Sequence, residues 1–340
     1  MKKKLSALLL TFVAAASLTG CANDSLDNTA SSEGKALEKI TFCLDWTPNT
    51  NHTGLYVAQQ MGYYEEAGLS VEIVQPPEDG ASLMCASGQA QFAIGCQDSM
   101  AASFDLEEPL EITSVSAVIN HNTSGIISRA GDGLDRPKGF EGKTYSSWES
   151  PIELATLKSV IETDGCDFEK VTMIPNTITD EPAALAANQT DAIWVFYGWG
   201  VINADVEGVD VDYWNFADID PVFDFYTPTI IANNDFLSEK PAVAQKFLDA
   251  TKKGYEYAIS HPKEAADMLI AGDTTGSLVG CEDLVYKSQE WISKQYIADG
   301  KKWGYIEPSR WDAFYGWLYE NGLTSKDLKG IGFTNDYLPE

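Results

Sequence analysis

The segment Leu44–Ala58 constrains the fold of this chain more than any other part of the sequence. Ile40–Trp46, which leads into it, is rich in apolar and β-favouring residues and predicts a strand, which ends before Pro48. From Gly54 to Ala67, apolar residues recur at helical spacing. A strand that leads through a short turn into a helix is typical of α/β folds, which bind ligands at the carboxyl ends of their strands. The sequence therefore predicts an α/β fold with a candidate site at this turn.

The turn carries Trp46, Asn49, Asn51 and His52. An indole ring, two carboxamides and an imidazole together suit a flat, polar, heteroaromatic molecule. The same residues also suit an ordinary Asn/Thr turn that caps a helix. This stretch alone leaves both interpretations open.

The alternation of strands and helices continues along the chain and predicts two lobes. Residues 40–119 have a β-α-β-α-β-α-β pattern, and residues 143–196 repeat it in shorter form. Gly131-Asp132-Gly133 indicates a crossing between the lobes. The extended segment Asp224–Ala232, from which Pro228 excludes a helix, indicates the return.

The predicted architecture is α/β, with two lobes that each hold a mixed, mainly parallel sheet flanked by helices, and with a ligand cleft between them. The chain after the return is helical, and its first long helix has an apolar stripe that includes Phe247 and Ala250. This stripe must pack against lobe 1, because no further sheet follows it. Two lobes joined by two crossings close on a ligand by hinge motion. The predicted boundaries are 40–128 with 230–340 for lobe 1 and 129–229 for lobe 2.

Further candidate ligand contacts stand at other predicted strand ends. Asp98 lies where a helix begins after the strand at 91–96, and the polar turn at 120–125 follows the next strand. A single aromatic residue belongs to the core more often than to a site, but recurrence at strand ends favours a pocket. The stacking rings that we expect are Trp46, Trp148, Tyr197, Trp199 and Tyr226. The polar contacts that we expect are Asn49, His52, Asp98, Asn122 and Ser124.

The N-terminus predicts export and lipid anchoring. Three lysines precede an apolar run, Leu5–Leu18, that is too short to span a membrane as a mature helix, so residues 1–20 are typical of a secretory signal peptide. Leu18-Thr19-Gly20-Cys21 resembles the bacterial lipobox. That resemblance implies cleavage before Cys21 and diacylation of its sulfur. The polar residues 21–39 predict a flexible tether, so we expect the protein on the outer face of the bacterial cell membrane.

The charge balance excludes several classes of partner. The chain has 51 acidic and 23 basic residues, a net charge of −28, and the leader removes three lysines but no acid. Such an acidic protein lacks the basic patches that nucleic acid or anionic lipid requires. Because no other apolar run reaches about 20 residues, we expect membrane contact through the N-terminal lipid alone. We also expect a monomer.

The cysteines and histidines predict no metal site and no cofactor. Beyond Cys21 the cysteines number five, which is odd, and none has metal-ligand spacing. We interpret them as small buried residues, with a Cys43–Cys96 contact possible on neighbouring strands. His52, His121 and His261 are too scattered for a zinc motif.

Several motifs support a resemblance to a known family. Residues 40–73, which contain Leu44–Ala58 and the Gly62–Leu69 segment, resemble the thiamine-pyrimidine-precursor-binding family of type II periplasmic binding proteins, and Gly88–Gly95 and Asn233–Leu237 match as well. The resemblance covers nearly all of residues 38–337. It implies the solute-binding component of an ABC importer, with a permease as partner. It also implies a ligand such as hydroxymethylpyrimidine or a formylaminomethyl-pyrimidine, and riboflavin or another flat heterocycle is the alternative.

The same family includes the fungal pyrimidine synthase, an iron-dependent enzyme. The resemblance places its catalytic lysine and histidine at Gln97 and Ala101 and its cysteine-rich run at Val222–Tyr226, none of which carries the required group. We therefore expect binding without catalysis.

One position departs from the binding members of the family. They often carry a carboxylate just after Tyr-Gly-Trp, where this chain has Gly200. Either another acid takes that role or the ligand differs. The candidates are Asp45, Asp98, Glu149 and Asp224.

Overall fold

The computed structural model describes residues 36–297 and 302–339. The predicted signal peptide, Cys21 and residues 21–35 of the predicted tether lie outside these residues. Within the described ranges, no helix is both long and apolar enough to cross a membrane.

The sheet of lobe 1 has the strand order β2-β1-β3-β10-β4. Its strands are β1 (Glu38–Cys43), β2 (Leu69–Val74), β3 (Phe92–Gly95), β4 (Ile112–Ala117) and β10 (Thr229–Asn233). β1 pairs parallel with β2 and β3, whereas β10 runs antiparallel between β3 and β4. Both faces of the central strands are apolar and buried, as a sheet covered on both sides by helices requires.

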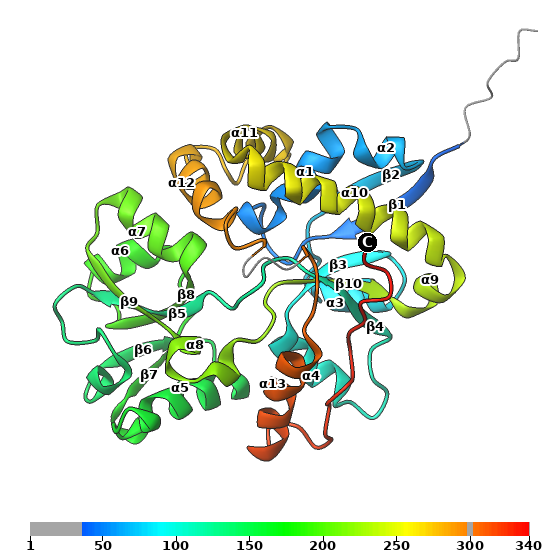
Figure 1. Cartoon of the computed structure of the whole chain (residues 1–340). Helices are drawn as coiled ribbons and strands as arrows, with labels where there is room; N and C mark the ends of the chain where they lie inside the picture. The colour runs from blue at the N-terminus through cyan, green and yellow to red at the C-terminus, as the bar shows by residue number, and fades with distance from the viewer. Residues whose placement is uncertain (1–35, 298–301, 340) are drawn as a thin grey trace, which may run out of the picture. The chain divides into compact units, whose positions relative to one another are not determined.

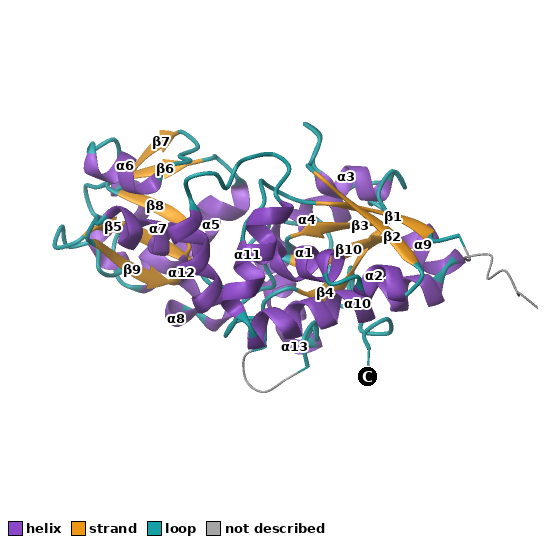
Figure 2. Cartoon of the chain, turned by 90° about the horizontal axis from the view of Figure 1, so that it is seen from above, coloured by secondary structure: helices purple, strands orange, loops and turns teal. Residues whose placement is uncertain are grey.

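Helices enclose this sheet on both faces (Figure 2). They are α1 (Thr53–Gln60), α2 (Tyr63–Glu66), α3 (Ala81–Ala86), α4 (Gln97–Phe104), α9 (Asn234–Glu239), α10 (Pro241–Ser260), α11 (Pro262–Gly272), α12 (Glu282–Ile292) and α13 (Pro308–Glu320). The predicted stripe of α10 is buried on the sheet, where Phe247 stacks on Phe92 at 4.1 Å between ring centroids. α10 also lies against α1 so closely that a Cβ on Gly254 would meet the Gly54 carbonyl oxygen at 2.0 Å.

The sheet of lobe 2 has the order β7-β6-β8-β5-β9, and Figure 1 shows its strands and helices in green. The strands are β5 (Ser124–Arg129), β6 (Thr144–Ser147), β7 (Thr172–Pro175), β8 (Ala192–Phe196) and β9 (Val211–Asn215), and the helices are α5 (Pro151–Thr163), α6 (Glu181–Ala186), α7 (Ile202–Glu207) and α8 (Phe216–Ile219). β6 pairs parallel with β7 and β8, whereas β5 is antiparallel to β8 and β9. Each sheet is thus mixed, as predicted, with two parallel and two antiparallel pairings, because one strand runs against the other four.

The first crossing comes earlier than the sequence predicted. β5 belongs to the second sheet, so the chain leaves lobe 1 between Ala117 and Ser124 rather than after residue 128. Gly131-Asp132-Gly133 is a turn inside lobe 2. A single apolar run does not show which sheet its strand will join. The boundary between the lobes is the polar turn before β5. The return crossing agrees with the predicted extended segment, because β10 follows it directly.

Two predicted helices are shorter than expected. The helix predicted from Gly54 to Ala67 divides into α1 and α2 at Gly62, whose φ of 74° is left-handed and interrupts the helix. The sequence of residues 282–299 likewise predicts one continuous helix, whereas α12 ends at Ile292.

The cysteines of the described residues are free thiols. Cys43, Cys85 and Cys166 are buried, as predicted for small core residues, whereas Cys96 and Cys281 are partly exposed. Cys43 and Cys96 form no bond with each other.

A cluster that we call the hinge clasp joins the two crossing segments, residues 118–123 and 224–228. It consists of Asp224, His121 and Arg310. One Asp224 oxygen accepts from the Asn122 backbone N–H at 2.8 Å, and the other lies 2.6 Å from His121 Nδ1 and 2.8 Å from Arg310 Nη1. The Arg310 guanidinium also lies 4.1 Å from the Tyr226 ring centroid. The first turn of α13 is thereby tied to both crossings.

We predict that Asp224→Asn destabilises the protein at neutral pH. Burial raises the pKa of the Asp224 carboxyl, but the His121 hydrogen bond and the Arg310 charge outweigh it and hold this pKa below its usual value. A lowered folded-state pKa stabilises the fold above the unfolded value of about 3.9, and this stability is lost as the pH falls through the folded value. Urea denaturation should show a loss of about 3 kcal/mol near pH 7 that shrinks below about pH 4.

The matched control is Glu162→Gln, which removes an exposed carboxylate paired with Lys158 one helical turn away. Such pairs contribute little, so its free energy of unfolding should change by less than about 0.5 kcal/mol. If Asp224→Asn has the same free energy of unfolding as Glu162→Gln near pH 7, the prediction is wrong.

Candidate functional site

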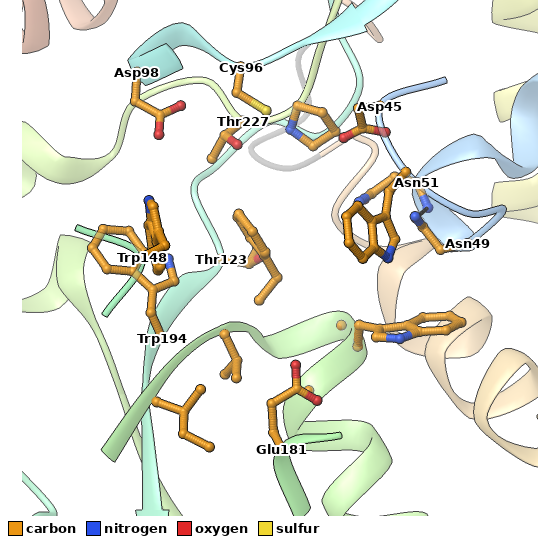
Figure 3. Close-up of a pocket in the computed structure, with 18 of the residues that line it drawn as sticks. Asp45, Asn49, Asn51, Cys96, Asp98, Thr123, Trp148, Glu181, Trp194 and Thr227 are labelled. Carbon is orange, nitrogen blue, oxygen red and sulfur yellow. Dashed lines mark hydrogen bonds between the residues drawn. The ribbon is translucent and has the colours of Figure 1, made fainter. Parts of the chain in front are cut away.

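A cavity of about 470 Å³ opens between the two lobes, as Figure 3 shows. Its walls come from the turn after β1, the start of α4, both crossing segments, the ends of β6 and β8, and the start of α6. These are mostly carboxyl ends of parallel strands, where α/β folds place ligands. The volume falls in the range of about 300–1,000 Å³ that small-molecule sites occupy.

Aromatic side chains from both lobes line the cavity. Trp46 comes from lobe 1, and Trp148, Trp194, Phe196 and Trp199 come from lobe 2. Trp46 and Trp148 are 58% and 47% exposed, among the largest exposures of big apolar side chains in the described residues. Trp148 also meets Trp194 edge to face, with 5.4 Å between ring centroids. Exposed indoles around a hollow provide stacking surfaces for a flat ring.

The turn after β1 forms the lobe 1 wall and is internally braced. Asn49 caps the short 3-10 helix Thr50–His52 by accepting from the Asn51 N–H at 2.9 Å. His52 is fully buried behind the turn: its Nδ1 accepts from the Asn49 N–H at 3.2 Å, and its Nε2 lies 2.8 Å from Asp45 Oδ1. Nδ1 therefore carries no proton, Nε2–H donates to Asp45, and the ring is neutral. His52 orients Asp45 but does not line the cavity.

Asp98 gives the strongest indication that this cavity binds a ligand. It lies in the first turn of α4 and lines the cavity, and its Oδ1 is buried without a hydrogen-bond partner among the described residues. Burial raises the pKa of this carboxyl. Buried polar atoms in folded proteins almost always have a partner, so an unpartnered oxygen beside a cavity indicates a group that the ligand supplies.

Glu181 is a lining residue that the sequence analysis missed. It stands in the first turn of α6, and burial followed by the charge of Asp180 raises the pKa of its carboxyl. In the sequence, Asp180-Glu181-Pro182 is typical of a helix start, which alone does not indicate a cavity residue. The rule applied to Asp98, an acid at a helix start beyond a strand end, would have found it. Other lining residues outside the ten expected contacts include Asp45, Asn51, Cys96, Thr123, Asn176, Trp194 and Thr227.

Five of the ten expected contacts line the cavity: Trp46, Asn49, Asp98, Trp148 and Trp199. The other five do not line it in the described structure: His52, Asn122, Ser124, Tyr197 and Tyr226. Their neighbours show that they support the walls instead.

These supporting residues hold the crossings and the segment after β8. Asn122 is buried and donates to the Phe223 carbonyl at 2.7 Å, and Ser124 is buried in β5. Tyr226 is buried and accepts from the Glu307 N–H at 2.7 Å. Tyr197 stacks on Trp291, with ring centroids 4.7 Å apart.

The local packing explains why Gly200 carries no carboxylate. Residues Tyr197–Val201 form a π-helix directly after β8. A Cβ on Gly200 would lie 2.7 Å from the Val195 Cβ, which is closer than real contacts allow. Of the acids considered as substitutes, Asp45 and Asp98 line the cavity, whereas Glu149 does not and Asp224 belongs to the hinge clasp.

A buried polar bridge connects the walls contributed by the two lobes. Ser288 on α12 shares a 2.6 Å hydrogen bond with Thr50 Oγ1 and donates to the Gly198 carbonyl of the π-helix. Next to it, Thr53 donates to Gln289 at 2.5 Å. α12 therefore sets the position of the turn that bears Trp46 relative to the π-helix that bears Trp199.

The arrangement of two lobes around this cavity is the fold of type II periplasmic binding proteins. The ligand-binding component of an ABC-type import system from Staphylococcus aureus has a similar structure, with a TM-score of 0.62 and 16% identity over 89% of this chain and 96% of that chain. At 16% sequence identity, this structural similarity establishes the fold alone.

The chain belongs to the NMT1/THI5 like family, whose model matches residues 49–265. A formylaminopyrimidine-binding protein of Halalkalibacterium halodurans is 28% identical over 296 residues, covering 86% of this chain and 87% of that protein. The 4-amino-5-hydroxymethyl-2-methylpyrimidine phosphate synthase THI13 of Saccharomyces cerevisiae is 22% identical over 67% of this chain and 69% of its own length. The relatives of this chain thus include both a binding protein and a synthase.

We predict that Gly200→Asp destabilises the protein, because its side chain would press against Val195. Overpacking of this kind costs about 1–3 kcal/mol. Ala183→Asp adds the same carboxylate at an exposed position of α6 and should change stability by less than about 0.5 kcal/mol. Thermal and urea unfolding of both variants would check this, and a Gly200 variant as stable as the Ala183 variant would refute the packing argument.

Proposed function

We propose that this chain is the solute-binding protein of a bacterial ABC importer and captures a small heteroaromatic precursor of the thiamine pyrimidine. Hydroxymethylpyrimidine and a formylaminomethyl-pyrimidine are the leading ligands. The single observation that carries the proposal is the buried Asp98 Oδ1 oxygen, which has no hydrogen-bond partner among the described residues and stands beside a cavity lined by indoles. The relative named for formylaminopyrimidine binding supports the choice of ring.

The cavity matches the two kinds of surface that an aminopyrimidine presents. Its flat ring would stack on Trp46, Trp148 or Trp199, and each such contact contributes about 0.5–1.5 kcal/mol beyond area burial. Its edge holds a ring nitrogen beside an amino group. A protonated Asp98 would donate to the nitrogen and accept from the amine, and its raised pKa favours that form. A ligand without this edge would leave Asp98 unsatisfied, which gives specificity.

Closure of the lobes completes the proposed cycle. The crossings lie behind the cavity and supply Thr123 and Thr227 to it, so a rotation there changes the separation of the walls. The closed form would bury the ligand and present the surface that a permease recognises. The hinge clasp lies on the same segments and limits the axis of such a rotation.

The cellular setting follows from the N-terminal sequence. Cleavage before Cys21 and its diacylation would anchor the protein to the outer face of the cell membrane, with residues 22–37 as a tether; the predicted end of the tether at residue 39 is corrected because β1 begins at Glu38. The acidic remainder would face outward as a monomer. Growth of cells with radiolabelled palmitate would test the anchor. The protein should incorporate the label, and the Cys21→Ser variant should not.

The proposal excludes a synthase-like reaction. Gln97, which stands where the synthase lysine is expected, is fully buried: it donates to the Trp311 carbonyl at 2.8 Å and accepts from the Tyr226 N–H at 2.9 Å. Ala101 is buried as well. Among the described residues, no group of three or more His, Cys, Asp or Glu is placed to hold a metal ion. Iron binding together with pyrimidine formation by the purified protein would overturn this part of the proposal.

Native mass spectrometry of the protein as purified tests the ligand directly. We expect a bound mass that matches a substituted aminopyrimidine, identified after release from the denatured protein. A bound flavin, visible as yellow colour, would favour the riboflavin alternative. An empty protein that shows no thermal shift with a panel of aminopyrimidines would refute the proposed ligand class.

We predict that Trp46→Ala weakens binding of the aminopyrimidine without unfolding the protein. The exposed indole contributes stacking surface but little core packing, so affinity should fall about tenfold while the melting temperature stays within about 2 °C. Tyr319→Ala removes an exposed ring of α13 outside the cavity and serves as the control. Calorimetric titration that gives equal affinities for both variants would remove Trp46 from the site.

A further inference from the structure

Three carboxyl groups line the cavity, and they differ in how the protein satisfies them. Asp45 has a partner, because its Oδ1 lies 2.8 Å from His52 Nε2. The Asp98 Oδ1 oxygen has no hydrogen-bond partner among the described residues. For the Glu181 carboxyl, the described part of the chain supplies only the backbone N–H of Glu181 itself. The cavity therefore holds two carboxyl groups whose further partners a ligand can supply.

Asp98 and Glu181 belong to different lobes. Asp98 stands on α4 of lobe 1, and Glu181 stands on α6 of lobe 2. Among the described lining residues, Glu181 is the only carboxyl that lobe 2 contributes. Figure 3 shows the two side chains on different sides of the cavity. One ligand can contact both carboxyl groups only if it carries hydrogen-bonding groups at two separate places.

The start of α6 fixes the place of Glu181 on the lobe 2 wall. Asp180 caps the helix by accepting from the Ala183 N–H at 3.1 Å, and Pro182 restricts the backbone of the first turn. Most other lining side chains of this lobe are apolar or aromatic. They include Trp148, Ile178, Ile193, Trp194, Val195, Phe196 and Trp199. A carboxyl group held in such a wall discriminates between ligands that pair with it and ligands that do not.

Closing the lobes removes water from the Glu181 carboxyl. A polar group that loses water without gaining a hydrogen bond weakens the complex. Burial already raises the pKa of this carboxyl, which favours its neutral form. A neutral carboxyl group both donates and accepts, so it matches an uncharged hydroxyl or amide group of a ligand. A methyl group at the same place would leave the Glu181 carboxyl unsatisfied.

We propose that Glu181 makes this cavity specific for a polar arm on the ligand, by hydrogen bonding to a hydroxyl or amide group outside the edge that Asp98 contacts. The inference rests on the proposed binding role of the cavity and adds a second contact that selects among flat rings. The ligand class is a flat heterocycle with one hydrogen-bonding edge and one uncharged polar arm. For the two leading pyrimidines, this arm is the hydroxymethyl or the formylaminomethyl group.

Calorimetric titration with two matched pyrimidines tests this role. They are hydroxymethylpyrimidine and the analogue in which a methyl group replaces the hydroxymethyl arm, so they share the ring and the amino edge and differ by one hydroxyl group. We expect the protein to bind the hydroxymethyl form about tenfold more tightly, because the methyl form leaves Glu181 unpaired. Equal affinities for the two pyrimidines would overturn the inference while pyrimidine binding itself stands.

Variants assign this preference to one residue. Glu181→Leu should reduce the ratio of the two affinities from about ten to below about two, whereas Glu181→Gln keeps a donor and an acceptor and should retain most of the ratio. Asp98→Ala should weaken both pyrimidines alike, because Asp98 contacts the edge that they share. Glu169→Leu replaces an exposed acid of lobe 2 outside the cavity and is the matched control.

Thermal unfolding shows whether each variant folds, and Glu181→Ala takes the place of Glu181→Leu if the latter does not. A folded variant of either kind that keeps the tenfold ratio would show that Glu181 does not contact the arm. A ratio that falls in Asp98→Ala instead would assign the arm to Asp98 and overturn the inference.

A second ligand pair separates this inference from the choice of pyrimidine. Riboflavin and lumiflavin share one flat ring system, and lumiflavin has a methyl group in place of the hydroxylated arm. If neither pyrimidine binds but riboflavin binds more tightly than lumiflavin, and Glu181→Leu removes that difference, the role of Glu181 stands and the pyrimidine proposal fails. If no member of either pair binds, both proposals fail.

Discussion

The exchange of one strand between the two halves of the chain is the constraint on which the rest of the structure depends. β5 enters the second sheet directly from lobe 1, and β10 enters the first sheet directly from lobe 2. Each runs antiparallel to its neighbours, and the two crossings lie side by side. The Asp224 carboxylate holds them together by bonding the Asn122 backbone, His121 and Arg310. The cavity exists because these crossings form its rear wall and the two sheets form its sides.

Much of this fold followed from local patterns in the sequence. Strand and helix periodicity predicted the two mixed sheets, and the apolar stripe with Phe247 predicted the packing of α10. The boundary near residue 128 was wrong because strand pairing is a long-range property. Nothing within Ser124–Arg129 tells whether it pairs with β4 or with β8 and β9.

The position of the cavity was predictable from the sequence, but the direction of each side chain was not. The rule that ligands lie at strand ends led to Trp46, Trp148, Trp199 and Asp98, which line the cavity, because the rule depends on topology alone. It did not distinguish these from Tyr226 or His52, whose side chains point behind the wall. Orientation depends on tertiary neighbours such as Arg310 above Tyr226 and Asp45 beside His52. The sequence analysis did not predict Trp194 as a cavity residue because it lies within a strand. Only the sheet geometry shows that its ring meets Trp148.

The strand order of the first sheet determines how late in synthesis lobe 1 can complete its fold. β4 pairs within the sheet with β10 and not with β3, so its partner strand is more than 100 residues away along the chain. The N-terminal lobe therefore cannot complete its sheet until the whole second lobe and Asn233 have been made. Such distant pairing slows folding. A chain with this topology therefore stays incompletely folded for most of its synthesis, and its sheet edges stay unpaired until β10 is made.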